Sequence, residues 1–190
     1  PRLTNRIDGG VPSVEERCDL AEGLLRAMSL TRGFARLVVL AGHGASSRNN
    51  PHAAGLDCGA CCGQTGEVNA RAAAALLNEP EVRSGLAGRG IDIPATTVFV
   101  PALHNTTTDE MTLFDTNAIA ATHGADLAAL GKCFARAGQA ARRERAPRLG
   151  LGGLPDPELE AAIRERSLSW SEVRPEWGLA GNASFIVAPR

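Results

Sequence analysis

Two side chains in the first third of the chain have the chemistry to bind a metal ion. His43 follows a short apolar run, and Cys58 comes fifteen positions later. The residues between them are rich in glycine, serine, asparagine and proline, which favour turns, so this loop can fold back on itself. Imidazole and thiolate are usual ligands of zinc in proteins. The sequence therefore predicts that His43 and Cys58 come together as part of a metal site.

Three further side chains leave the chemistry of this loop open. His52, Cys61 and Cys62 lie in or beside it, and the spacing of Cys58 and Cys61 would let Cys61 act as another metal ligand. A single Cys-x-x-Cys turn is also typical of thiol redox sites, in which the two cysteines form a reversible disulfide. A loop without chemistry of its own is the remaining interpretation.

Two apolar runs predict the strands that position the histidines. Residues 37–40 are typical of a short buried strand ahead of His43, and residues 96–100 of a second strand that ends at Pro101, ahead of His104. If these strands are parallel neighbours, both histidines open onto one crevice. Open α/β sheets bind their ligands in such a crevice, beyond the carboxyl ends of the strands.

Helical patterns fill much of the remaining sequence. Ser13 and Glu16 make a capping box that starts one helix, and residues 67–78 form an alanine-rich second helix. Apolar residues recur at helical spacing over residues 127–141. Helices that alternate with strands predict an α/β fold, with a mostly parallel sheet flanked by helices on both faces.

The end of the third predicted helix is basic. Six lysines and arginines gather there: Lys132, Arg136, Arg142, Arg143, Arg145 and Arg148. Such a cluster usually forms a solvated face, which is the expectation here. A docking surface, for a partner or for a part of the protein outside this chain, is the alternative.

Length and composition bound the class of protein. At 190 residues and 44% apolar content, the chain suits a single globular α/β domain, with a flexible joint predicted at the glycines of 150–153. No apolar run approaches the roughly 20 residues that cross a bilayer, and a net charge of -1 gives no general attraction to nucleic acid. The chain opens at Pro1 without a Met, so we expect residues 1–190 to be a portion of a larger protein.

Three strings of the sequence resemble one known family. They are GHGASSRNNPHAAGLDCGACCGQTGEVNAR at 42–71, VPALHNTTTDEM at 100–111 and PEWGLAGNASFIVAPR at 175–190. All three resemble the DabA family, the large peripheral subunit of a bacterial system that accumulates inorganic carbon. The family is similar to β-type carbonic anhydrases in its metal site. Its members bind zinc through a Cys-x-Asp pair on one strand and a later His and Cys.

The resemblance implies that His43 and Cys58 are the later His and Cys ligands of a Zn²⁺ ion. No Cys-x-Asp occurs in these 190 residues, so the pair that completes the site is expected outside this chain. The implied fold is β-carbonic-anhydrase-like and incomplete, since family members are several times longer. His104 and Asp109 are candidates for holding a ligand in place or carrying a proton.

The function that the resemblance implies is energy-coupled uptake of inorganic carbon. Zinc-bound hydroxide would convert CO₂ to bicarbonate, and the subunit would work with a membrane-embedded, cation-antiporter-like partner of the DabB type. The expected location is peripheral, on the cytoplasmic side of a bacterial inner membrane, and the isolated chain is expected to be inactive. The alternative is a scaffold without chemistry that docks the membrane partner through its basic helix end and through Trp170 and Trp177.

Overall fold

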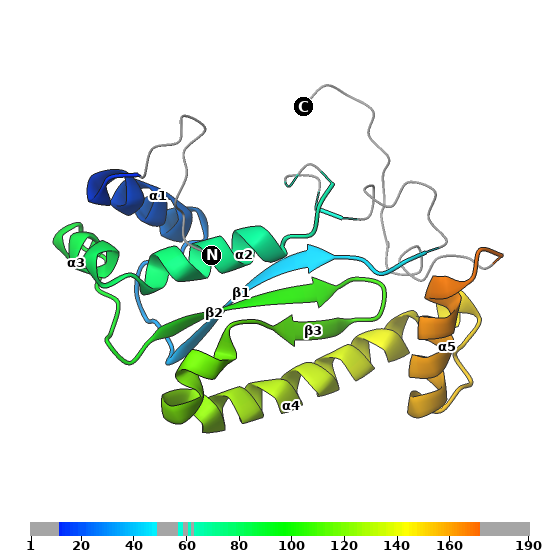
Figure 1. Ribbon diagram of the computed structural model, residues 1–190. Helices are drawn as coiled ribbons and strands as arrows, with labels where there is room; N and C mark the ends of the chain where they lie inside the picture. The colour runs from blue at the N-terminus through cyan, green and yellow to red at the C-terminus, as the bar shows by residue number, and fades with distance from the viewer. Residues whose placement is uncertain (1–11, 49–56, 59–60, 62, 172–190) are drawn as a thin grey trace.

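A computed structural model describes residues 12–48, 57–58, 61 and 63–171 of the chain. These residues form a small sheet with helices on both faces, as Figure 1 shows. Helices α1 (Val14–Ala27), α2 (Glu67–Asn78) and α3 (Pro80–Gly88) lie on one face, and α4 (Ala120–Arg145) lies on the other. The predicted α/β class is confirmed.

Three strands make up the sheet in the described part of the chain. β1 (Leu37–Gly44) pairs in parallel with β2 (Val98–Asn105), and β2 pairs antiparallel with β3 (Glu110–Leu113). The sheet is therefore mixed, so a partly parallel sheet is confirmed and a mostly parallel one is not. The register places His43 opposite His104. The two histidines do belong to parallel neighbouring strands.

Both strands extend past the ends predicted for them. His43 and His104 lie inside β1 and β2, one residue before the last, rather than beyond the strand ends. Pro101 does not end β2, because its nitrogen faces away from β1 and the pairing with β1 continues through its neighbours. The Pro101 carbonyl accepts a hydrogen bond from Phe114 N at 2.9 Å, just past the last ladder pair. A proline at this position removes no hydrogen bond between β2 and β1.

The main core lies between the sheet and helices α1, α2 and α3. α1 begins at the predicted capping box, where the Ser13 hydroxyl accepts from Glu16 N at 3.2 Å and the Glu16 carboxylate accepts from Ser13 N at 2.8 Å. Large apolar side chains from all three helices and from β2 are fully buried: Leu25, Leu76, Leu77, Val82, Leu86 and Phe99. Burial of one such side chain stabilises the fold by about 1.5–3 kcal/mol.

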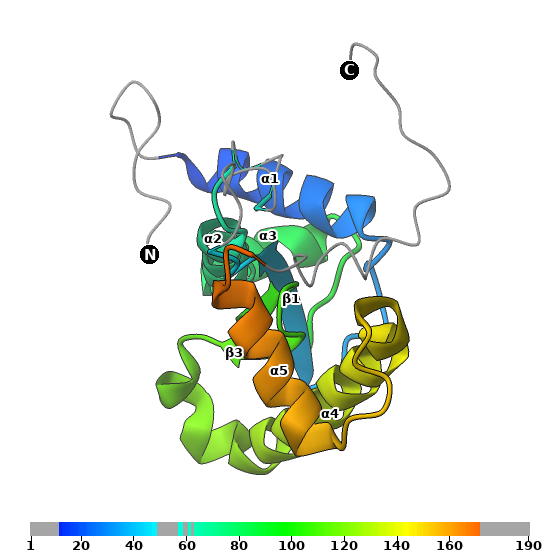
Figure 2. The ribbon, with the colours of Figure 1, turned by 90° about the vertical axis from the view of Figure 1, so that its right-hand side faces the viewer.

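A smaller core joins α4 to the end of the described chain. The short helix η4 (Ala146–Leu149) and α5 (Asp156–Leu168) bury Leu149, Leu159 and Ile163 together. Gly150 turns the chain between them with φ 73°, and the flexibility predicted for residues 150–153 stays a prediction. Figure 2 shows α5 beside the end of α4. None of the helices in the described residues is long and apolar enough to span a membrane.

Side chains cap the part of the β2 edge that β3 leaves uncovered. The Asn78 amide nitrogen donates to the Phe99 carbonyl at 2.8 Å, and the Asn78 amide oxygen accepts from Phe99 N at 3.1 Å. Arg83 donates to the Thr97 carbonyl at 2.8 Å. Asn78 thus makes the two hydrogen bonds that a neighbouring strand would make. An edge satisfied in this way is protected from pairing with another chain.

The start of α2 lies against β1 at a contact that only glycine permits. A β carbon added to Gly42 would lie 2.3 Å from the Gly66 carbonyl oxygen, and one added to Gly66 would lie 2.8 Å from Gly42 Cα. Gly66 N also donates to the His43 carbonyl at 2.8 Å. The backbone that leads into α2 is therefore held directly beside the strand that carries His43.

Gly42→Ala should destabilise the fold, because the new methyl group meets backbone atoms that cannot move aside. Overpacking of this kind costs about 1–3 kcal/mol of unfolding free energy, which urea denaturation measures. Gly23→Ala in α1, where an added β carbon meets nothing within 4 Å, is the control and should stabilise the chain by about 0.5–1 kcal/mol. An unchanged stability of the Gly42→Ala variant would contradict the close contact.

Candidate metal site

His43 lies near the end of β1 and is exposed to solvent. Side chains alternate between the two faces of a strand. A β carbon added at Gly42 would point at Gly66, and one added at Gly44 would meet the Thr65 side chain at 3.1 Å. The segment that leads into α2 therefore covers one face of β1 here, and His43 projects from the opposite face.

The loop that carries Cys58 returns to the end of β1. The Asp57 carboxylate accepts a hydrogen bond from Ala45 N at 3.0 Å, which ties the residue before Cys58 to the residue after β1. Cys58 forms a β-bridge with Gln64, in which Cys58 N donates to the Gln64 carbonyl at 3.0 Å. The Cys58 backbone is thus brought back to the end of the strand that carries His43.

The donors in this region fit part of a zinc site. Cys61 lies next to Cys58, with Cys61 N donating to the Cys58 carbonyl at 3.0 Å. Within residues 12–48, 57–58, 61 and 63–171, no three His, Cys, Asp or Glu side chains are grouped to hold a metal ion. Zinc takes three or four protein ligands, so His43 and Cys58 have suitable chemistry but not the full number. The pair stays a prediction, and His52 and Cys62 lie outside the described residues.

A second imidazole lies beside His43. His104 is the register partner of His43 on β2, so both side chains project from the same face of the sheet. The His104 Nε2 atom lies 3.3 Å from Asp109 Oδ1. The structure thus brings together His43, His104 and Asp109, which the sequence analysis selected as candidates.

Asp109 is buried and is held by an arginine of α4. The Asp109 residue is 5% exposed, and its Oδ2 atom lies 2.8 Å from Arg145 Nη2. Arg145 also donates to the Thr107 carbonyl at 2.6 Å. Asp109 has a left-handed backbone with φ 57°, and a β carbon added to Gly138 of α4 would lie 2.3 Å from the Asp109 carbonyl oxygen. A tight helix contact and a buried ion pair therefore fix the carboxylate that meets His104.

The predicted solvated face at the end of α4 is wrong for two of its arginines. Arg142 and Arg145 are only 8% and 3% exposed, and Arg142 donates to the Thr108 carbonyl at 2.9 Å. A run of basic residues is usually solvated, so charge alone did not identify them. Gly138, Arg142 and Arg145 are spaced by four and three residues, which places them on one face of a helix. This spacing is the feature of the sequence that could have identified Arg142 and Arg145 as part of a buried helix face.

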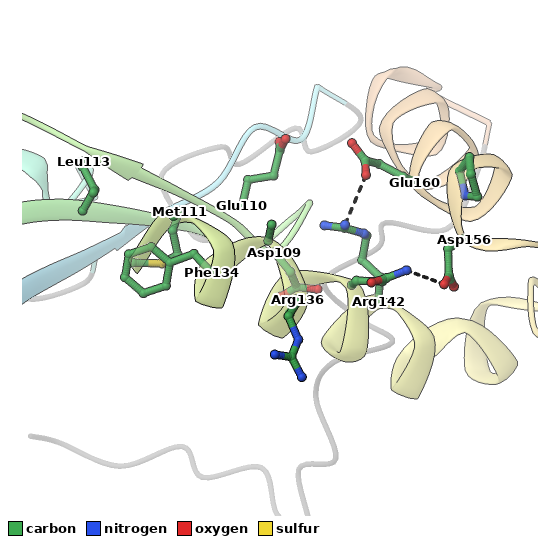
Figure 3. Close-up of a pocket in the computed structure, with 13 residues that line it drawn as sticks. Asp109, Glu110, Met111, Leu113, Phe134, Arg136, Arg142, Asp156 and Glu160 are labelled. Carbon is green, nitrogen blue, oxygen red and sulfur yellow. Dashed lines mark hydrogen bonds and ion pairs between the residues drawn. The ribbon is translucent and has the colours of Figure 1, made fainter. Parts of the chain in front are cut away.

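A cavity of about 700 Å³ lies beside this ion pair, between β3, α4 and α5 (Figure 3). Met111, Leu113 and Phe134 line its apolar end. Figure 3 shows Arg142 directed at Glu160, with Nη2 3.1 Å from Oε2. Each carboxylate that lines the cavity has an arginine partner, and these carboxylates are Asp109, Glu110, Asp156 and Glu160. The cavity therefore offers no uncompensated acidic group for a cation.

Comparisons with known proteins match the whole chain to one family. The family model described as "Probable inorganic carbon transporter subunit DabA" matches residues 2–190. A relative with that description from Roseiflexus castenholzii is 56% identical over 100% of this chain, and "Probable inorganic carbon transporter subunit DabA 1" from Bradyrhizobium sp. (strain ORS 278) is 55% identical over 100% of it. This chain spans 23% of the length of each relative. No solved structure matches it.

Asp109→Asn should destabilise the chain by about 3–5 kcal/mol, because it leaves the Arg145 guanidinium buried without a counter-charge. Asparagine keeps the side-chain shape and tolerates the left-handed backbone, so urea denaturation would report the loss of charge. Asp156→Asn is the matched control. It removes an ion pair with Arg143 in which both side chains are 41% exposed, and should change stability far less. Equal losses in the two variants would contradict the role of the buried pair.

Proposed function

This chain belongs to the DabA family, and from that membership we propose that it is part of a longer subunit for inorganic carbon uptake. Its role there is to supply His43 and Cys58 as two of the ligands of a zinc ion. The description of its relatives as inorganic carbon transporter subunits supports this role. The observation that carries the zinc proposal is the return of the Cys58 backbone to the end of β1, through the Asp57 to Ala45 hydrogen bond.

The donor chemistry supports zinc rather than a harder cation. An imidazole and a thiolate suit zinc, whereas magnesium and calcium take oxygen ligands. When bound, zinc acidifies a water molecule, which is the chemistry that hydration of CO₂ to bicarbonate requires. The remaining ligands, a Cys-x-Asp pair in the proposal, come from the part of the protein outside residues 1–190.

His104 and Asp109 serve this site by their fixed position. His104 Nε2 lies 3.3 Å from Asp109 Oδ1, and Arg145 holds Asp109 from the other side at 2.8 Å. The imidazole of His104 is therefore oriented beside His43, on the same face of the sheet. In this proposal the Nδ1 atom of His104 exchanges a proton with the site, and the contact of Nε2 with the buried carboxylate keeps the ring in place.

The proposed partner is a membrane-embedded subunit of the cation-antiporter type, DabB-like. The subunit would act on CO₂ and bicarbonate at the cytoplasmic side of a bacterial inner membrane, as a peripheral protein. The relatives' description as transporter subunits supports work within a complex. Coupling to an ion gradient would then make hydration of CO₂ one-directional.

A scaffold that docks the membrane partner is the second candidate function. Trp170 favours it, because this large side chain is 72% exposed. The basic end of α4 supports it less than the sequence suggests, since three arginines there are paired with carboxylates. Arg142 pairs with Glu160, Arg143 with Asp156 and Arg145 with Asp109.

Thiol redox chemistry at Cys58 and Cys61 also stays a prediction. The Cys61 sulfur accepts a hydrogen bond from the Asn69 amide at 3.1 Å, a contact that suits a thiolate. Redox function requires that a Cys58 to Cys61 disulfide form and reduce reversibly. Thiol titration of the full-length protein before and after mild oxidant tests it, and an unchanged thiol count would exclude it.

Loss of either proposed ligand should remove zinc from the full-length protein. Since loss of a group that only supports a ligand weakens metal binding about 10–100-fold, His43→Ala and Cys58→Ser should each weaken it at least as much. Elemental analysis after dialysis measures the bound zinc. Cys133→Ser, at an exposed thiol on α4, is the control and should leave zinc unchanged. Full zinc content in both ligand variants would favour the scaffold function.

A further inference from the structure

β1 is an edge strand whose outward backbone groups have no partner in the described part of the chain. Its two ends show which residues face β2, because the Arg36 carbonyl accepts from Val98 N and the Gly44 carbonyl accepts from Thr106 N, both at 2.8 Å. Even-numbered residues of β1 therefore direct their N–H and C=O groups at β2. Odd-numbered residues direct theirs outward.

Three consecutive odd-numbered residues leave this edge open. Leu37, Val39 and Ala41 each present an outward N–H and C=O, and no hydrogen bond reaches them from any described residue. At the next odd position, the His43 carbonyl is already taken by Gly66 N. The open stretch is therefore long enough for a short strand and ends beside the candidate metal site.

The exposed edges of β2 and β3 are protected from pairing with another strand, whereas the edge of β1 is not. Asn78 and Arg83 cap the uncovered part of β2. β3 is only four residues long and lies over α4, and very short edge strands resist pairing with other chains. β1 has eight residues and none of these protections along its open stretch.

The side chains of β1 are also less buried than their composition predicts. Residues 37–40 are all apolar, yet each is only half-buried, and Ala41 is exposed. In the neighbouring strand, Phe99, Val100 and Ala102 are 1%, 1% and 0% exposed. A long apolar edge with open hydrogen-bonding groups is a template for another strand.

We propose that the open edge of β1 binds an extended strand from the part of the same polypeptide outside residues 1–190. This chain spans 23% of the length of its relatives, so most of the polypeptide remains to supply the strand. The bound strand pairs with Leu37, Val39 and Ala41 and covers the half-buried apolar side chains. A side chain on that strand level with His43 lies about 5 Å from it, the spacing of paired strands. The proposal rests on family membership and is independent of zinc.

Residue-resolved hydrogen exchange of the full-length protein tests the pairing. The amides of Val39 and Ala41 should exchange at least about 100-fold more slowly than those of an unstructured peptide. Val38 and Leu40 are internal controls, since their amides face β2 and stay slow in any folded state. Rapid exchange at Val39 and Ala41, with Val38 and Leu40 slow, would overturn the proposal whether or not the protein binds zinc.

Photo-crosslinking identifies the occupant. p-Benzoylphenylalanine placed at the exposed Ala41 position of the full-length protein should cross-link within one polypeptide, to a peptide outside residues 1–190. A cross-link to a peptide within residues 1–190 would overturn the proposal, because the occupant would then be this chain itself. A cross-linked dimer would overturn it in favour of a second copy.

Discussion

The ion pair between Asp109 and Arg145 is the constraint on which the packing of α4 against the sheet depends. The 26-residue helix α4 buries His123, Gly138, Arg142 and Arg145, a polar set with no large apolar side chain. A buried guanidinium is stable only where acceptors and a counter-charge meet it. The Thr107 and Thr108 carbonyls and the Asp109 carboxylate provide these. The carboxylate that places α4 is therefore the same one that meets His104.

Local patterns in the sequence were sufficient for the helices and for the two strands that carry the histidines, but not for the pairing of these strands. Ser13 does start α1, and the two apolar runs do form neighbouring parallel strands. The strand ends could not be predicted, because Gly42 and Pro101 act as breakers only when tertiary structure does not override them. Gly42 instead admits the backbone of Gly66, and the Pro101 nitrogen faces away from β1, so the pairing of the two strands continues past it.

The candidate site could be predicted by residue type but not by environment. His43, Cys58, His104 and Asp109 stand out because of what imidazole, thiol and carboxylate groups can do. Arg145 lies far along the chain and became part of the cluster only when α4 packed on the sheet. In the proposed zinc site the remaining ligands lie outside this chain, so no pattern within it could identify them.

The close approach of Gly42 and Gly66 also has an electrostatic consequence. Gly66 is the N-cap of α2, so its contact with Gly42 places the amino terminus of α2 beside the end of β1. Aligned peptide dipoles give a helix amino terminus about half a positive elementary charge. Negative charge that develops at this end of the sheet, on a sulfur or on a small anion, is therefore stabilised by the backbone of α2 itself.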